Sequence, residues 1–218
     1  MVIFDCNGVL VDSEQLATAI VSQEFMRVGF PLTQDIIARY FTGRRPADMF
    51  AEVEAAARRK LPENFAAMVS TAILRRFRAE LRATRHAAYA LTWLRGPKCV
   101  ASSSGLDRIR VSLEATDLIR FFEPYLFSGN DVPKGKPAPD LFLHAAKKMR
   151  VPPSDCIVVE DSPVGVGAGV AAGMTVIGFV GGSHAGPRLG NHLRAAGAHA
   201  VINDMRALKS TIIDLRGW

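Results

Sequence analysis

The sequence predicts an α/β protein with a doubly wound parallel sheet and an inserted helical-bundle cap domain. Three observations support this fold class: short apolar runs alternate with helical stretches, the runs are apolar throughout, and one connection is far too long for a simple crossover. Strands of a parallel sheet are apolar throughout because helices cover both of its faces. With 218 residues, the chain is long enough for this core and a small added unit.

Six segments have the length and composition of buried strands. They are rich in apolar and β-branched residues, and each is separated from the next by a stretch with helical periodicity. In chain order they are Val2–Phe4, Lys98–Ala101, Tyr125–Phe127, Cys156–Val159, Thr175–Val180 and His199–Ile202. This alternation predicts βαβ units in one Rossmann-like sheet.

The connection between the first two strands is the exception to this pattern. A parallel crossover needs only about a dozen residues, whereas this segment extends to Lys98 and is helical nearly throughout. Ser13 is a candidate helix N-cap, and Gly and Pro residues mark three breaks: Gly29–Pro31, Gly43 with Pro46, and Leu61–Pro62. We therefore expect a four-helix cap over residues 13–84, and a core formed by residues 1–12 and 85–218.

Composition and charge restrict the partners and the location. The net charge is +6, but the arginines of the segment Leu74–Arg85 fall on one side of an amphipathic helix without base-stacking aromatic residues, so we expect no nucleic-acid partner. No apolar stretch is long enough to span a bilayer and no signal peptide is visible, which favours a cytoplasmic protein without a membrane partner. We expect a monomer. Three cysteines without a CxxC pair indicate buried, reduced thiols.

Residues whose side chains can take part in catalysis follow the predicted strands. In open α/β sheets, ligands bind beyond the carboxyl ends of the strands, so residues that follow different strands should converge on one rim. They are Asp5, Ser102, Ser103, Lys134, Lys136, Glu160 and Asp161. Carboxylates, lysine and hydroxyl groups are the set that phosphoryl transfer requires: a nucleophile, oxygen ligands for a divalent cation, and donors for the phosphoryl oxygens.

The same residues carry a resemblance to a known family. The stretch Phe4–Glu14, FDCNGVLVDSE, resembles the first motif of the haloacid dehalogenase-like superfamily, which usually reads DxDG followed by an apolar stretch and DSE. Ser102 after CVA resembles the second motif, Lys136 in GKPAPDLF the third, and Val158–Pro163, VVEDSP, the fourth. The match extends over essentially the whole chain. The EDS form and the small helical cap resemble the branch that contains β-phosphoglucomutase and several sugar-phosphate and phosphoglycolate phosphatases.

The resemblance implies a Mg²⁺-dependent hydrolase that acts on a small phosphorylated metabolite of the sugar-phosphate or phosphoglycolate type. Asp5 would attack phosphorus and become an aspartyl phosphate, while Ser102 and Lys136 would hold the phosphoryl oxygens. The implied metal ligands are Asp5, the main-chain carbonyl of Asn7, Asp161 and Glu160. Ser103 is a further candidate for substrate binding. In such caps a Gly-x-basic segment often meets the substrate, and its match here, YFTGRRP, makes Gly43, Arg44 and Arg45 the candidate specificity residues.

Asn7 departs from the family pattern. Relatives use an aspartate there as general acid and base, and a carboxamide can perform neither role. Asn7 is consistent with a natural variant of altered chemistry, with a deliberate substitution that traps an intermediate, or with an inactive relative that only binds its ligand. The loss of a general acid typically costs about 10²- to 10⁴-fold in rate, so residual activity is expected.

Other classes fit the sequence less well. A non-enzymatic phosphate-binding relative is the main alternative, and a mutase or a dehalogenase comes after it. A serine hydrolase would use Ala101–Gly105 as a nucleophile elbow with Asp161 and His184, but it leaves Asp5, Lys136 and Glu160 without roles. A dinucleotide site at Gly167–Ala172 is disfavoured because its glycines do not directly follow a strand.

Overall fold

The computed structural model describes residues 1–216 and contains one parallel sheet with the strand order β3-β2-β1-β4-β5-β6. The strands are β1 Val2–Phe4, β2 Lys98–Ser102, β3 Leu126–Ser128, β4 Ile157–Glu160, β5 Thr175–Phe179 and β6 Ala200–Ile202. All six predicted strands are present, and their bounds differ from the predicted ones by one residue at most. The register pairs Ile3 with Cys99 on one side and with Val158 on the other.

The strand order places a topological switch at β1. The chain builds the sheet outward from β1 through β2 and β3 on one side, and then returns to β4 on the other side. Such a switch point leaves a crevice beyond the carboxyl ends of its two central strands. Here these ends carry Asp5, after β1, and Glu160 and Asp161, at the end of β4.

Helices cover both faces of the sheet, which is therefore doubly wound as predicted. Alternate residues of each strand point to opposite faces: Phe4 packs in the same cluster as α6, whereas Ile3 packs with α7 and α8. The core helices are α5 Ala87–Trp93, α6 Leu106–Ala115, α7 Asp140–Met149, α8 Pro163–Ala171, α9 Leu189–Ala195 and α10 Leu208–Arg216. Short 3-10 helices lie at η1 Ile119–Phe121, η2 Gly129–Asp131, η3 Pro153–Asp155 and η4 Met205–Ala207.

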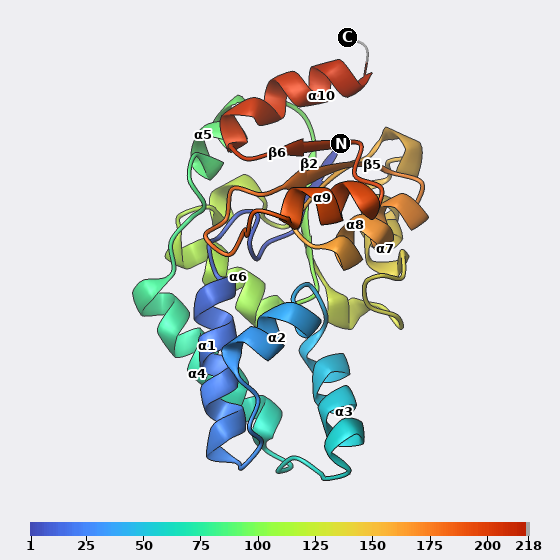
Figure 1. Cartoon of the computed structure of the whole chain (residues 1–218). Coiled ribbons are helices and arrows are strands. Elements are labelled where there is room, and N and C mark those ends of the chain that lie inside the picture. Colours follow the sequence, from blue (N-terminus) through green and yellow to red (C-terminus); the bar gives the residue numbers. More distant parts are fainter. Residues whose placement is uncertain (217–218) are drawn as a thin grey trace.

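Four helices between β1 and α5 form the inserted cap, which projects from one end of the sheet (Figure 1). They are α1 Glu14–Arg27, α2 Gln34–Phe41, α3 Pro46–Ala57 and α4 Phe65–Glu80. The cap has an aromatic centre, in which Phe25 contacts the rings of Phe30, Phe50 and Phe65. Helix α4 also packs against α6 of the core, so the cap and the core share a boundary. The division at residues 13 and 84 remains a prediction.

Several local predictions can be compared with the structure. Ser13 occupies the N-cap position of α1, as predicted, although its hydroxyl makes no capping bond and donates to Asn7 instead. Cys6, Cys99 and Cys156 are free and buried, as predicted. Gly169 packs α8 closely on the sheet, since a Cβ there would lie 2.7 Å from Val176. Among the helices of the described chain, none has the length and apolarity needed to cross a membrane.

Candidate active site

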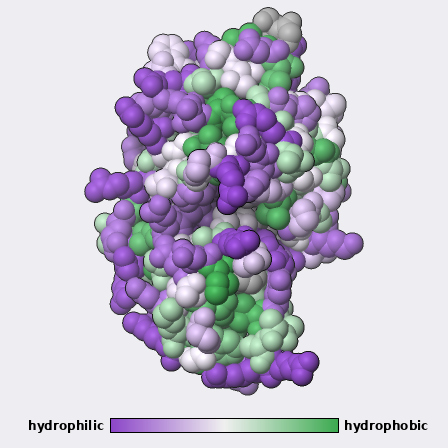
Figure 2. Space-filling model, viewed as in Figure 1, coloured by the Kyte–Doolittle hydropathy of each residue, from purple (hydrophilic) through white to green (hydrophobic). Residues whose placement is uncertain are grey.

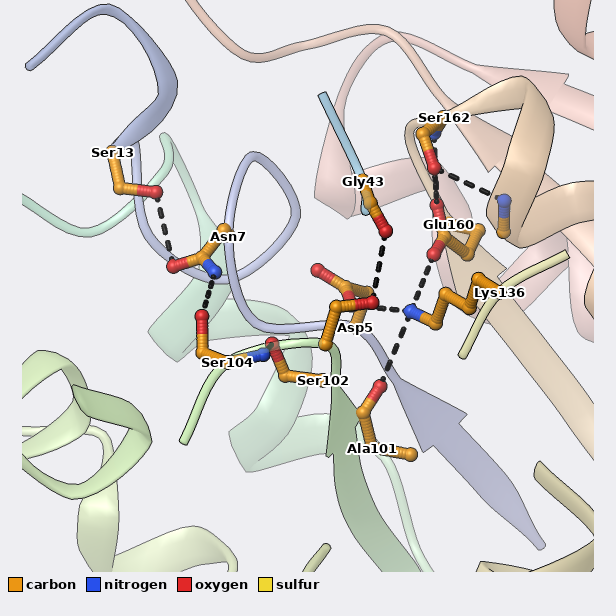
Figure 3. Close-up of polar contacts among 12 residues, drawn as sticks. Asp5, Asn7, Ser13, Gly43, Ala101, Ser102, Ser104, Lys136, Glu160 and Ser162 are labelled. Carbon is orange, nitrogen blue, oxygen red and sulfur yellow. Dashed lines mark hydrogen bonds and ion pairs between the residues drawn. The ribbon is translucent and has the colours of Figure 1, made fainter. Parts of the chain in front are cut away.

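Lys136 joins two strand ends at the centre of the site. Its Nζ donates to Asp5 Oδ1 at 2.6 Å and to Glu160 Oε1 at 2.7 Å, and it lies 3.4 Å from the carbonyl oxygen of Ala101 (Figure 3). All three side chains are buried. The structure therefore brings together a carboxylate after β1, a carboxylate at the end of β4 and a lysine from the loop after β3. Lys134, expected on the same rim, is exposed and forms no ion pair with the carboxylates in the described chain.

The buried carboxylates outnumber the cations close to them. Burial raises the pKa of Asp5 to about 8, although Lys136 opposes the rise. Burial likewise raises the pKa of Asp161 to about 7, against the opposing effect of His184. Burial alone would lower the pKa of Lys136, but Asp5 and Glu160 raise it above its ordinary value. A further positive charge would stabilise the ionised carboxylates.

The donor set fits a hard divalent cation. Asp5, Glu160 and Asp161 each offer one carboxylate oxygen, and these oxygens lie within 4.8 Å of one another. Both oxygens of Glu160 are already engaged, because Oε1 accepts from Lys136 and Oε2 accepts from the amide and hydroxyl of Ser162 at 2.8 and 3.0 Å. Asp161 Oδ2 lies 2.9 Å from His184 Nε2 and has no other polar partner within residues 1–216. Carboxylate oxygens are the ligands Mg²⁺ prefers, and Asp5 and Asp161 are better placed than Glu160 to bind it directly.

A histidine that sequence reasoning did not assign to this cluster lies beside Asp161. His184 Nε2 is 2.9 Å from Asp161 Oδ2, and His184 belongs to the loop that follows β5. Asp161 also approaches the loop after β1 very closely: a Cβ on Gly8, whose φ is +76°, would lie 1.9 Å from Asp161 Oδ2. Only glycine fits there. The strand-end rule, applied to β5, would have pointed to His184.

Asn7 is held by two hydroxyl groups. Its Nδ2 donates to Ser104 Oγ at 2.9 Å, and its Oδ1 accepts from Ser13 Oγ at 3.1 Å (Figure 3). Ser102 Oγ accepts from the amide of Ser104 at 3.3 Å, which shapes the turn after β2. Ser102, Ser103 and Asn7 all line the cavity that contains Asp5. The structure thus brings these predicted site residues to one place.

The loop between α2 and α3 closes over this turn. Gly43 has a φ of +81°, and its carbonyl oxygen accepts from Ser103 Oγ at 2.8 Å. A Cβ at Gly43 would lie 2.4 Å from Ser162 Oγ. Gly43 therefore allows the cap backbone to touch two loops of the core, and any larger residue would force them apart.

The two cap arginines occupy different places. Arg44 lines the cavity and forms an ion pair with Glu52 at 2.6 Å. Arg45, expected to contact substrate, does not line the cavity; its guanidinium pairs with Asp48 at 2.8 Å. Its Nη1 donates, at 3.3 to 3.4 Å, to three carbonyl oxygens of the core: Gly129, Val132 and Pro133. Arg45 consequently links the cap to the core, a position that only the packing of distant segments reveals.

The cavity above Asp5 measures about 80 Å³ and also contains two charged residues that sequence reasoning did not single out. Glu14 lies at the start of α1, within the first motif. Arg108 lies on the first turn of α6, and its guanidinium carbon is 5.0 Å from the centre of the Phe77 ring. Its Nε has no hydrogen-bond partner in the described chain. Burial lowers the pKa of Arg108, while Glu14 and Asp5 oppose that shift. In the sequence, the position of Arg108 one helical turn after Ser102–Ser104 could have indicated that it lies near the site.

Comparison with known proteins decides the family. The model of the haloacid dehalogenase-like hydrolases matches residues 1–173. The chain belongs to the haloacid dehalogenase-like hydrolase family. Over 187 residues it is 33% identical to 6-phosphogluconate phosphatase of Escherichia coli strain K12. This alignment covers 85% of each protein.

Solved structures of haloacid dehalogenase-like proteins share the whole fold. A member of unknown function from Agrobacterium tumefaciens has a TM-score of 0.82 at 34% identity, covering 99% of this chain and 98% of that one. A putative β-phosphoglucomutase from Thermotoga maritima has a TM-score of 0.71 at 28% identity, over 98% of both chains. These likenesses confirm the predicted superfamily and the branch that the sequence resembles.

Membership in the haloacid dehalogenase-like family agrees with the geometry better than the serine-hydrolase alternative does. Ser103 Oγ donates to Gly43, while His184 Nε2 lies 2.9 Å from Asp161 Oδ2 and its Nδ1 has no partner among the described residues. A serine nucleophile needs a base within hydrogen-bond reach, so the serines do not form a triad with His184 in this structure.

Proposed function

We propose that this haloacid dehalogenase-like hydrolase is a Mg²⁺-dependent phosphatase that removes the phosphoryl group from a small phosphorylated metabolite. The observation that carries the proposal is the buried Asp5 carboxylate, which Lys136 holds at 2.6 Å in a cavity lined by Ser102, Ser103 and Asn7. The similarity to a phosphatase of 6-phosphogluconate supports phosphate-ester chemistry. The acidic cluster supports Mg²⁺ as the cofactor.

The first half of the reaction forms a covalent intermediate. The Asp5 oxygen not held by Lys136 attacks phosphorus, the bond between phosphorus and the ester oxygen breaks, and an aspartyl phosphate results. Lys136, with a raised pKa, remains protonated and binds a phosphoryl oxygen, as does the hydroxyl of Ser102. Mg²⁺ bound by Asp5 and Asp161 would offset the repulsion between the carboxylate and the phosphate.

The two proton transfers are the weak point of this site. The departing ester oxygen must gain a proton, and the water that later attacks the aspartyl phosphate must lose one. Asn7 stands where a carboxylate would exchange both protons, and its amide is bound to Ser13 and Ser104. We expect slow turnover, with hydrolysis of the intermediate as the step most affected.

A second candidate function is ligand binding without turnover, which Asn7 alone favours. It would retain Asp5, Lys136 and the metal ligands as a phosphate-binding site. The two functions differ in one observable: only the phosphatase transfers a phosphoryl group to Asp5.

The test is an assay with an activated aryl phosphate, whose good leaving group needs little help from an acid. We expect slow hydrolysis that requires Mg²⁺, and a phosphorylated Asp5 in the mass spectrum of rapidly quenched protein. Asp5→Asn should abolish both signals, and Asp214→Asn, at an exposed position on α10, is the matched control. Saturable phosphate binding with no hydrolysis by either the unmodified protein or Asn7→Asp would instead establish the binding function.

A further inference from the structure

The cap wall of the active-site cavity is mainly apolar. Its apolar residues include Val21 of α1, Met49 and Phe50 of α3, and Val69 and Ile73 of α4. Its charged residues are Glu14 and Arg44, and Arg44 is paired with Glu52. Figure 2 shows hydrophobic residues gathered over the cap in the lower half of the molecule, with hydrophilic residues where the cap meets the core. Because Asp5 holds the phosphoryl group on the core side, the leaving group must face this wall.

The hydroxyl groups of the cap wall are already used within the cap. Thr18 Oγ1 donates to the carbonyl oxygen of Glu14 at 2.8 Å and accepts from Gln34 at 3.2 Å. Thr42 Oγ1 donates to the carbonyl oxygen of Ala38 at 2.8 Å. A site that selects a polyhydroxylated substrate pairs the substrate's hydroxyl groups with its own polar groups, and neither threonine has a hydroxyl hydrogen left to donate to one.

A second cavity adjoins the first and is lined by residues of α3, α4 and α6. It measures about 400 Å³, and the two cavities share Pro46, Phe50, Val69, Ile73 and Arg108. Beyond these shared residues the second cavity is lined by apolar side chains such as Leu74 and Leu106, and by the polar or charged side chains of Ser70, Asp107 and Asn130. Its size is that of a small-molecule pocket, and the shared wall places it directly beside the space above Asp5.

We propose that the leaving group of the substrate carries an apolar or aromatic part that extends past Ile73 into this second cavity, and that the substrate is not a simple sugar phosphate. The inference rests on the proposed phosphatase function and specifies its substrate class. Half-buried Arg108, which lines both cavities, would face the ester end of such a molecule. The apolar part packs on α4.

Binding measurements test the inference independently of turnover. With Mg²⁺ present, the Kd of hexylphosphonate is compared with that of methylphosphonate by isothermal titration calorimetry, since a phosphonate offers no ester bond to hydrolyse. One methylene in an apolar pocket changes specificity by about 10-fold or more, so hexylphosphonate should bind at least about tenfold more tightly. Its binding should also have the more negative heat-capacity change, the marker of apolar burial.

A pair of variants on α4 locates the effect. Ala66 is exposed and lines the second cavity, whereas the adjacent Ala67 is also exposed but lines neither cavity. Ala66→Phe should fill the cavity and remove most of the advantage of hexylphosphonate, with methylphosphonate binding unchanged. Ala67→Phe should leave both Kd values unchanged, and it controls for the effect of a phenylalanine on the helix.

Turnover separates the inference from the proposed function. The Asn7→Asp variant is assayed with n-hexyl phosphate and glucose 6-phosphate, which are both esters of a primary alcohol with six carbons. A kcat/KM at least about tenfold higher for n-hexyl phosphate is expected. Equal phosphonate affinities, or a preference for glucose 6-phosphate, would overturn the inference and leave the phosphatase intact. If neither ester is hydrolysed, the phosphatase proposal fails, and the phosphonate affinities still decide whether the second cavity binds apolar groups.

Discussion

Asn7→Asp is the change with the most informative expected outcome. The new carboxylate would lie in the cavity that contains Asp5, within reach of the Ser104 hydroxyl at 2.9 Å and the Ser13 hydroxyl at 3.1 Å. Both hydroxyls can rotate to donate, so the carboxylate fits without rearrangement. A general acid and base typically contributes about 10²- to 10⁴-fold, and we expect a gain in kcat of that size for an alkyl phosphate.

The gain should depend on the leaving group. An aryl phosphate departs with little need for a proton, so Asn7→Asp should increase its rate of phosphoryl transfer much less than that of an alkyl phosphate. The assay is steady-state kinetics on both esters, with kcat/KM as the measure of phosphoryl transfer to Asp5, together with the fraction of phosphorylated Asp5 in quenched samples. That fraction should fall in the variant, because hydrolysis of the intermediate no longer limits turnover.

The matched control is Asn191→Asp, which adds the same charge on α9 at an exposed position. It should leave the kinetics unchanged. An equal increase in kcat/KM for both esters, or no increase for either while the variant remains folded and binds Mg²⁺, would refute the assignment of residue 7 as the acid and base position.

Three further predictions follow from the structure. The metal-free protein should lose stability as pH rises from 3.8 towards 8. Burial raises the pKa of Asp5 to about 8 and that of Asp161 to about 7, so the folded state holds more protons than the unfolded state in this range. Mg²⁺ should reduce this loss, and melting temperatures that do not vary with pH across the range would contradict the prediction. Gly43→Ala should raise KM and weaken cap closure, because its φ is +81° and the new Cβ would lie 2.4 Å from Ser162 Oγ; limited proteolysis and kinetics check this, and unchanged values of both would count against the close contact. Phe25→Ala should lower the free energy of unfolding, measured by urea denaturation, by about 3–5 kcal/mol, as expected for a large aromatic removed from a packed core. A loss below about 1 kcal/mol would show that the cap is less tightly packed than the ring contacts indicate.

The strands and the residues that follow them were predictable from the sequence. A buried parallel strand is apolar throughout, and the carboxyl ends of such strands meet at one edge of the sheet. This reasoning places Asp5, Lys136, Glu160 and Asp161 together from the sequence alone. It failed for Lys134, which belongs to the same loop as Lys136 but is exposed, because the strand-end rule places a loop and not the direction of each side chain.

Local patterns also predicted where the four cap helices begin and end. Gly and Pro residues interrupt helices because of their backbone requirements, and all three predicted breaks separate helices in the structure. Propensity alone could not determine what the end residues bind. Ser13 looked like a helix cap, yet its hydroxyl donates to Asn7, since a partner brought near by the fold competes with the local bond.

The sequence by itself determined the sheet, the insertion, the family and the residues of the catalytic rim, because these depend on short periodic patterns and on motifs at strand ends. Only the tertiary structure decided that Arg45 binds carbonyl oxygens of the core instead of lining the cavity, that His184 lies beside Asp161, and that Arg108 joins two cavities. Each of these positions depends on how segments far apart in the chain pack against one another, and no local pattern in the sequence records that packing.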